Sequence, residues 1–316
     1  MLTIKTHRHL QEIEPFWPQK VSTPFQSFAW HDCWARNFLD QAKIEILTFW
    51  DEAKLLAIAP LYKEATGYHL MGTPPNISDY LDLIWATTNP QKINAVLKIL
   101  FEFLKKSQVS FLHVPETSPT WKYVQKYHES NATIFPEITP QLDCPASWEI
   151  YLNNLEKKKK HELKRKMNRL AQIPYEIRYS QTQMEIKTEI SNLYLLIKKS
   201  LPPKNKFMTK TMQIFFDEFT SSFAANKQIL LTQLITTKKT IAAILYFQYH
   251  NKLYMYNSGF NPDYQYFSPG LLLAAYNLQY AIEHKFTQLD FLRGNERYKY
   301  DLGAQDHFIY NINLKL

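Results

Sequence analysis

Two periodic patterns of apolar residues alternate along the chain and predict elements of both kinds. Apolar runs and strict alternation, typical of β-strands, occur at 43–50, 54–62, 68–72 and 109–114, and again at 229–236, 240–249, 252–259 and 287–292. Apolar residues three and four apart, typical of helices, occur at 26–40, 90–106, 184–199, 209–225 and 268–284. The chain therefore predicts the mixed α/β class with helices layered on sheets.

The same order of elements occurs twice, and short segments of the two halves are alike. LLAIAPLYK at 55–63 resembles TIAAILYFQ at 240–248, and VSFLHVPE at 109–116 parallels LDFLRGNE at 289–296. The pattern is interrupted by PQLDCPAS at 140–147, which is typical of a connection. We therefore expect two similar α/β domains, at 1–146 and 147–316, each with a mostly antiparallel central sheet flanked by helices.

The predicted helix at 268–284 begins with residues suited to an anion site. Ser268 is a favoured N-cap, Pro269 suits the first helical position, and Gly270 leaves the amide of Leu271 uncovered. Orphan N–H groups and the positive end of the helix dipole favour a phosphate there. A strand pattern ending at Gly259 precedes this helix. The same caps are also consistent with an ordinary helix whose N-terminus meets water.

Four ionisable residues follow the last strand pattern within ten positions: Asp290, Arg293, Glu296 and Lys299. Acyl transfer to an amine or hydroxyl needs a base for the acceptor proton and a positive group for the oxyanion. Glu296 or Asp290 suits the first role, and Lys299 or Arg293 suits the second. A structural ion-pair network is the alternative explanation, because such networks also cluster charges.

Positive charge is concentrated in one segment. The net charge is +8, and KKKKHELKRKMNR at 157–169 supplies +7 of it from eight Lys/Arg and one Glu. Lys164, Arg165 and Arg169 of this predicted helix are candidates to bind coenzyme phosphates, a lipid-linked pyrophosphate, RNA or anionic lipids. A solvated helix face is the alternative.

A second candidate segment is SDYLD at 78–82. Asp79, Tyr80 and Asp82 could hold the acceptor in a cleft that also contains the C-terminal charged cluster. A turn held by Asx hydrogen bonds explains the same residues equally well.

Several classes of protein are excluded or disfavoured. The sequence has no apolar run of 18 residues, no secretory signal pattern and only two cysteines, Cys33 and Cys144, so we expect a cytoplasmic protein without disulfides. It also has no zinc-ligand spacing, no P-loop, no dinucleotide fingerprint and no nucleophile elbow. A metal enzyme is therefore not expected.

Three segments carry a resemblance to a known family. SPGLLL at 268–273, LDFLRGNERYK at 289–299 and DLG at 301–303 resemble the C-terminal half of the CelD-like acetyltransferases. That family is associated with cellulose biosynthesis, belongs to the GNAT superfamily and is related to the FemAB-type transferases. The resemblance implies tandem GNAT-like domains, acetyl-CoA or another acyl-CoA as co-substrate, and Lys299 at the reaction centre. The glycine-rich pyrophosphate loop of most GNAT enzymes is missing here, and only Gly270 stands in its place.

The resulting expectation is an N-acyltransferase. Its acceptor would be an amine or hydroxyl on a small molecule, or on a lipid- or sugar-linked precursor of the cell envelope. A FemAB-type transferase that uses aminoacyl-tRNA is one alternative, with the basic helix contacting RNA. A non-catalytic binding protein is another, and contact of the basic helix with an anionic membrane surface is open in each case.

Overall fold

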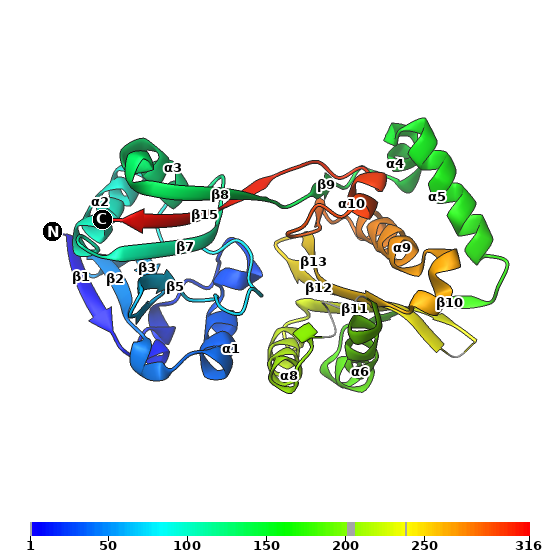
Figure 1. Cartoon of the computed structure of the whole chain (residues 1–316), viewed down its shortest axis with the longest axis horizontal. Coiled ribbons are helices and arrows are strands. Elements are labelled where there is room, and N and C mark those ends of the chain that lie inside the picture. The colour runs from blue at the N-terminus through cyan, green and yellow to red at the C-terminus, as the bar shows by residue number, and fades with distance from the viewer. Residues whose placement is uncertain (1, 201–205, 238) are drawn as a thin grey trace. The chain divides into compact units, whose positions relative to one another are not determined.

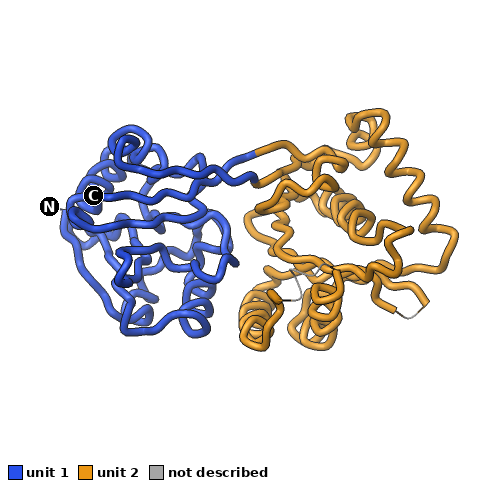
Figure 2. The backbone as a smooth tube through the Cα atoms, viewed as in Figure 1, with its two compact units in different colours: residues 1–138, 307–316 blue, residues 139–306 orange. Residues whose placement is uncertain are grey.

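The computed structural model describes residues 2–200, 206–237 and 239–316. The chain divides into two compact units (Figure 2). Unit 1 comprises residues 1–138 and 307–316, and unit 2 comprises residues 139–306. Both units combine sheets with flanking helices, which confirms the predicted α/β class.

Unit 1 contains two sheets. The first has the strand order β1-β2-β3-β6 and the second β4-β5-β7-β15-β8. Its strands are β1 Leu2–His7, β2 Ile46–Asp51, β3 Lys54–Ala59, β4 Leu61–Glu64, β5 Gly67–Leu70, β6 Ile84–Trp85, β7 Gln108–Pro115, β8 Ala132–Ile138 and β15 Phe308–Lys315. Its α-helices are α1 Phe28–Phe38, α2 Pro90–Phe103 and α3 Pro119–Tyr127.

Unit 2 is built on one six-stranded sheet with the order β10-β11-β12-β13-β14-β9. The strands are β9 Gln141–Asp143, β10 Tyr175–Ser180, β11 Ile229–Thr236, β12 Lys239–Tyr249, β13 Lys252–Phe260 and β14 Gln288–Asp290. The helices are α4 Trp148–Asn154, α5 Lys157–Leu170, α6 Gln183–Ser200, α8 Lys210–Ala224, α9 Pro269–Glu283 and α10 Arg297–Asp301. Helices α6 and α8 cover one face of the sheet, and α9 lies on the opposite face (Figure 1).

Alternating residues of the strands explain these layers. On β11, Leu230 and Leu234 join the core beneath α9, together with Leu272, Ala275 and Leu278 of that helix. On the other face, Phe219 of α8 packs against Phe247 of β12, with ring centroids 5.6 Å apart. Because each strand has one apolar set for each face, the sheet is buried on both sides.

The division into units differs from the expected domains 1–146 and 147–316 in two respects, and the first is that unit 2 begins at Thr139. Second, strand β15 at the C-terminus pairs with β7 and β8, so residues 307–316 fold with unit 1. Pairing between two strands distant in sequence satisfies the backbone groups of β15 on both edges. The chain therefore passes between the units twice, near Thr139 and near Asp306.

No helix within residues 2–200, 206–237 and 239–316 combines the length and apolar character that crossing a bilayer requires.

Candidate functional site

Strands β13 and β14 of unit 2 run parallel but stay paired over only three residues, Lys252–Tyr254 against Gln288–Asp290. Strand β14 ends at Asp290, whereas β13 continues to Phe260. The edge of β13 that faces β14 is therefore without a described strand partner from Met255 onward. Such an edge offers N–H and C=O groups to an extended ligand.

Two features shape this open edge. The β12–β13 register shifts between Leu245 and Tyr246, which leaves Tyr256 as an extra residue on β13. A bulge of this kind bends the strand and redirects its side chains. At the far end, the N–H of Phe260 donates to Ser200 Oγ of α6 over 2.7 Å. The stretch of β13 without a described strand partner is thus limited to about Met255–Gly259, and within it the N–H of Ser258 donates to Asn257 Oδ1 over 3.1 Å.

Gly259 has a packing role. A Cβ at this position would lie 2.3 Å from the backbone nitrogen of Ile197 in α6. Only a residue without a side chain lets the helix backbone approach β13 this closely. A contribution of the Gly259 backbone to ligand binding stays a prediction.

The chain leads from β13 through a 3-10 turn, η6 Pro262–Phe267, directly into α9. Ser268 stands at the N-cap as expected, but it has left-handed dihedrals (φ 51°, ψ 50°) and its hydroxyl makes no capping hydrogen bond. The predicted side-chain cap is therefore wrong, because the direct passage from η6 to α9 places the turn at Ser268. The first helical hydrogen bond runs from Leu272 N–H to Ser268 O. The N–H groups of Gly270 and Leu271 precede it and therefore have no acceptor within the helix.

Gly270 leaves room at this helix start. A Cβ there would meet only Phe260 Cδ1, at an ordinary 3.7 Å, and the φ of Gly270 is not positive. Neither packing nor backbone conformation requires glycine, although glycine in a helix costs up to about 1 kcal/mol relative to alanine. A bare backbone at this position suits close approach of a ligand to the helix N-terminus.

A basic pocket of about 740 Å³ adjoins the first turn of α9. Its lining combines one face of α5 with α10 and the start of α9: Glu156, Lys158, Lys159, His161, Glu162, Leu163, Lys166, Leu271, Arg297, Asp301 and Leu302. Three cations at its walls have acidic neighbours: Lys159 at 3.4 Å from Glu156, Lys166 at 3.7 Å from Glu162, and Arg297 at 3.8 Å from Asp301. Lys158 has no ion pair among the described residues and adds an uncompensated positive charge.

The three residues predicted on the basic helix lie elsewhere. Arg165 forms two hydrogen bonds with Glu162, of 2.8 and 2.7 Å, and these lower the pKa of the Glu162 carboxyl to about 2. Arg169 lies over the ring of Tyr266 at 4.4 Å and donates to its carbonyl over 2.7 Å, which joins α5 to η6. Lys164 is exposed. The sequence analysis did not single out the α5 cations that line the pocket, Lys158, Lys159 and Lys166. Their helical spacing around the apolar Leu163 was visible in the sequence.

The charged cluster after β14 surrounds a buried lysine. Lys299 is 2% exposed, and its ammonium donates to the carbonyls of Leu292 at 3.3 Å, Arg293 at 2.9 Å and Gly294 at 2.9 Å. Its Nζ also lies 2.9 Å from Glu296 Oε2. These four oxygens outnumber the three N–H donors of an ammonium group. Lys299 therefore holds the 292–296 loop in its conformation.

Asp290 has a similar local contact. It is 2% exposed, and its Oδ1 accepts the N–H of Leu292 over 2.8 Å. Leu292 has a φ of 54°, so the carboxylate stabilises a left-handed turn at the end of β14. Glu296 is 58% exposed on its side chain and is the most accessible carboxylate of the cluster. The structure thus brings Arg293, Glu296 and Lys299 together around one loop, and their catalytic roles stay predictions.

The SDYLD segment lies in unit 1. Asp82 is buried and accepts hydrogen bonds from Ser118 Oγ at 2.6 Å, Thr120 Oγ1 at 2.5 Å and Leu83 N at 2.8 Å. Burial raises the pKa of its carboxyl to about 6, and these hydrogen bonds oppose the rise. Asp82 therefore attaches the segment to the start of α3. Asp79 is also buried and Tyr80 has a φ of 54°, and their part in acceptor binding stays a prediction.

No group of three or more His, Cys, Asp or Glu side chains suited to a metal ion occurs in the described parts of the chain.

Part of unit 2 is similar to a known family. Residues 157–300, all of them in unit 2, match the family model described as the acetyltransferase (GNAT) domain. The search of curated protein sequences gave no match.

Solved structures share the fold over most of the chain. FemX aligns with a TM-score of 0.64 at 12% identity, over 99% of this chain and 97% of its own. L-PGS from Bacillus licheniformis aligns with a TM-score of 0.56 at 12% identity, over 94% and 93%. A conserved protein of unknown function from Bacteroides thetaiotaomicron aligns with a TM-score of 0.54 at 11% identity, over the full length of both. At such identities the likeness concerns the fold alone.

Proposed function

We propose that the chain is a GNAT-type N-acyltransferase of the CelD-like family. It would move an acetyl or other acyl group from acyl-CoA to an amine or hydroxyl of a sugar, a cell-envelope precursor or a related metabolite. The observation that carries this proposal is the open edge of β13 leading to an α9 N-terminus with a bare Gly270. Because acyl-CoA is a cytoplasmic metabolite, we propose a cytoplasmic enzyme.

Each part of the donor has a counterpart in this geometry. The amide groups of pantetheine would pair with the main chain of β13 along Met255–Gly259, as a peptide does at a sheet edge. The pyrophosphate would accept hydrogen bonds from the N–H groups of Gly270 and Leu271 at the positive end of α9. Lys158 and Arg297 of the adjoining basic pocket would attract the remaining phosphate charge.

The acyl carbon would then lie where β13 and β14 diverge, near Asp290. A main-chain N–H of β13 near Met255 would be the donor for the oxyanion of a tetrahedral intermediate. Glu296 is exposed and is our candidate for the base that removes the acceptor proton. Lys299 would act by holding the 292–296 loop that carries Glu296 and Arg293.

The basic pocket supports a second candidate donor. A transferase that takes its acyl group from aminoacyl-tRNA would need a cationic surface for the RNA backbone, and α5 provides one. The fold shared with FemX is compatible with this alternative.

Binding of acetyl-CoA tests the proposal. Acetyl-CoA at 100 times its dissociation constant should stabilise the protein by about 2.7 kcal/mol, because it binds only the native state. Gly270→Val places a branched side chain over the proposed phosphate site, and a tenfold loss of affinity would remove about 1.4 kcal/mol of that stabilisation. Gln279→Val, nearer the other end of α9, is the matched control and should bind as the wild type does.

Each outcome is informative. Equal acetyl-CoA affinity in wild type and Gly270→Val would contradict the proposed phosphate site. Stabilisation by charged tRNA alone would favour the second donor. Stabilisation by neither would indicate a binding protein that retains the fold.

A further inference from the structure

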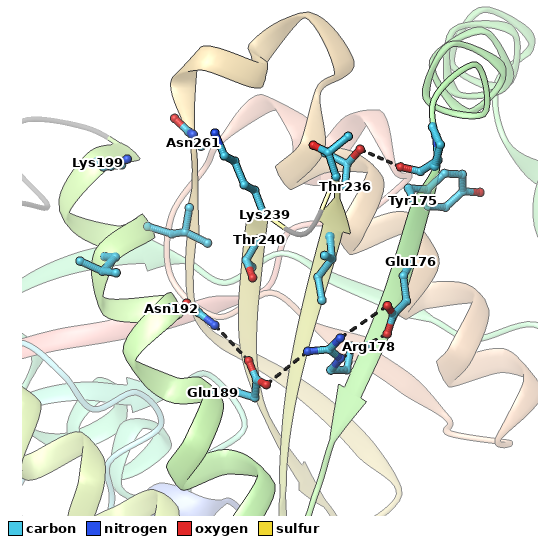
Figure 3. Close-up of a pocket in the computed structure, with 15 residues that line it drawn as sticks. Tyr175, Glu176, Arg178, Glu189, Asn192, Lys199, Thr236, Lys239, Thr240 and Asn261 are labelled. Atoms are coloured by element: carbon cyan, nitrogen blue, oxygen red, sulfur yellow. Dashed lines mark hydrogen bonds and ion pairs between the residues drawn. The ribbon is translucent and has the colours of Figure 1, made fainter.

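A groove in unit 2 lies outside every part assigned to acyl transfer. It encloses about 790 Å³ and lies over the ends of β10, β11 and β12 that face α6 (Figure 3). Helix α6 is held against β13 by the close approach at Gly259. The groove occupies the space beside the second half of that helix, and its volume is within the range of small-molecule sites.

One end of the groove is a fixed polar wall. Arg178 of β10 donates to Glu176 on the same strand over 3.2 Å and to Glu189 of α6 over 3.2 Å. Asn192, one turn along α6, donates to the second oxygen of Glu189 over 3.0 Å. Figure 3 shows that these hydrogen-bonded side chains extend from strand β10 to helix α6 at this end of the groove. Because Arg178 is engaged by two carboxylates, this end carries no surplus positive charge.

The opposite end carries two lysines. Lys199 comes from the last turn of α6 and Lys239 from the start of β12, and the Lys239 side chain extends toward Asn261 (Figure 3). Within the described residues the ammonium group of neither lysine forms an ion pair or a hydrogen bond. Two uncompensated ammonium groups at one end of a concave surface favour an anionic group there.

Between the two ends the lining combines apolar side chains with threonines, among them Thr240. Leu195, Leu196 and Ile235 form its apolar part, and Leu195 is 58% exposed although it is a large apolar residue. A ligand with an apolar body would cover this surface and gain from its removal from water.

A buried amide lies further along the same face of the sheet. Gln233 stands two residues before Ile235 on β11, next to Arg178 in the strand register. It is fully buried, and neither its Nε2 nor its Oε1 has a hydrogen-bond partner among the described residues. A buried amide without partners is costly, about 1–3 kcal/mol for each unpaired group. A hydrogen-bonding group that enters from the groove would offset this cost.

We infer that this groove binds a small amphipathic anion. Its carboxylate or phosphate lies between Lys199 and Lys239, and its apolar part lies on Leu195, Leu196 and Ile235. The site is separate from the donor site, so the inference does not rest on the proposed function.

The probes are hexanoate and hexyl phosphate, which share a tail and differ in the anionic group. Hexanamide lacks the charge and inorganic phosphate lacks the tail. We expect titration calorimetry or ligand-detected NMR to show binding of at least one anionic probe, at least about tenfold tighter than binding of hexanamide or inorganic phosphate, because charge and tail both contribute. The better probe identifies the headgroup.

Variants locate the site. Lys199→Gln with Lys239→Gln should weaken the better probe at least about tenfold, and Leu195→Glu should weaken it through repulsion. All three positions are exposed, so the fold should persist. Lys198→Gln with Lys285→Gln, which lie outside the groove, is the matched control and should change the affinity less than about twofold.

Three results would overturn the inference. The first is no measurable binding of either anionic probe to the wild type. The second is equal loss of affinity in the groove variant and in the control. The third is competitive displacement of the probe by CoA together with loss of probe binding in Gly270→Val, which would assign the probe to the donor site. Unchanged CoA binding in the groove variant supports two separate sites.

Discussion

Replacing Lys299 by alanine tests whether the charged cluster is a scaffold for the 292–296 loop. The ammonium is buried and donates to three carbonyl oxygens at 2.9 to 3.3 Å. Its removal leaves these carbonyls without their charged donor. Hydrogen bonds to charged groups contribute about 1.5–3 kcal/mol each, and loss of one partner from a buried charged group costs about 3–5 kcal/mol. We therefore expect Lys299→Ala to lower the free energy of unfolding by about 4 kcal/mol.

The size of this effect sets the measurement. At about 2–4 °C per kcal/mol for a domain of this length, the melting temperature should fall by roughly 8–16 °C. Urea unfolding followed by far-UV circular dichroism gives the free energy directly. Glu296→Gln should cost only about 0–1 kcal/mol, because the Glu296 side chain is 58% exposed.

Lys252→Ala is the matched control. Lys252 also lies at the β13–β14 pair, and its ammonium donates to a single acceptor, Gln288 Oε1, over 2.9 Å. It should lose less than about 1 kcal/mol, as expected for one partly exposed hydrogen bond. A Lys299→Ala protein as stable as the Lys252→Ala protein would refute the scaffold role. Turnover measured well below both melting temperatures then separates a catalytic contribution of Lys299 from its effect on stability.

Four further predictions follow from individual features of the structure. Gly259→Ala should lower the free energy of unfolding by several kcal/mol, measured by urea titration, because its Cβ would lie 2.3 Å from the backbone of Ile197. Burial raises the pKa of Asp82 to about 6, so the wild-type free energy of unfolding should fall by roughly 3 kcal/mol as the pH rises from about 4 through 6. In Asp82→Asn this fall should be absent when stability is measured against pH. Burial lowers the pKa of His31 to about 4, so His31 should make the free energy of unfolding rise by a similar amount between about pH 4 and 6.5. In His31→Gln this rise should be absent. Calorimetric titration should give one acetyl-CoA per chain, and a stoichiometry of two would contradict the restriction of the donor site to unit 2.

The order of helices and strands was largely predictable from local pattern. The strand pattern at 229–236 coincides with β11, and the predicted helix at 268–284 coincides with α9 within one residue at each end. These elements have strong periodicity because each faces a buried layer. The return of β15 into unit 1 was not predictable, since it pairs with residues of β7 and β8 that lie 170 to 207 positions earlier, from Phe308↔Ile138 to Lys315↔Gln108.

The charged cluster after β14 was visible in the sequence, but the contacts of each side chain were not. The family resemblance implied Lys299 at the reaction centre, which stays a prediction, and the sequence did not reveal that its ammonium donates to backbone carbonyls. Those carbonyls point inward because Leu292 and Gly294 have positive φ, a conformation that the sequence pattern did not reveal. On the basic helix, composition identified the segment, but only its packing against α9 and α10 decided that Lys158 and Lys166 face the pocket.

One difference between the two similar halves explains why we expect a single donor site. In unit 1, β5 and β7 are also parallel and pair over only two residues, Tyr68–His69 against Val109–Ser110. The chain after β5 does not enter a helix as it does after β13. It runs through a largely buried segment, and the N–H of Leu81 donates to the carbonyl of His113 over 3.0 Å.

This segment closes in unit 1 the gap that stays open in unit 2. Asp82, with its hydrogen bonds to Ser118 and Thr120, fixes the segment against α3. A backbone edge already bonded within the protein cannot pair with a ligand without breaking those bonds. In unit 2, by contrast, the edge beyond Met255 faces no described strand and leads to the α9 N-terminus. Under the proposed function, this closing segment is the reason why we expect donor binding in unit 2 alone.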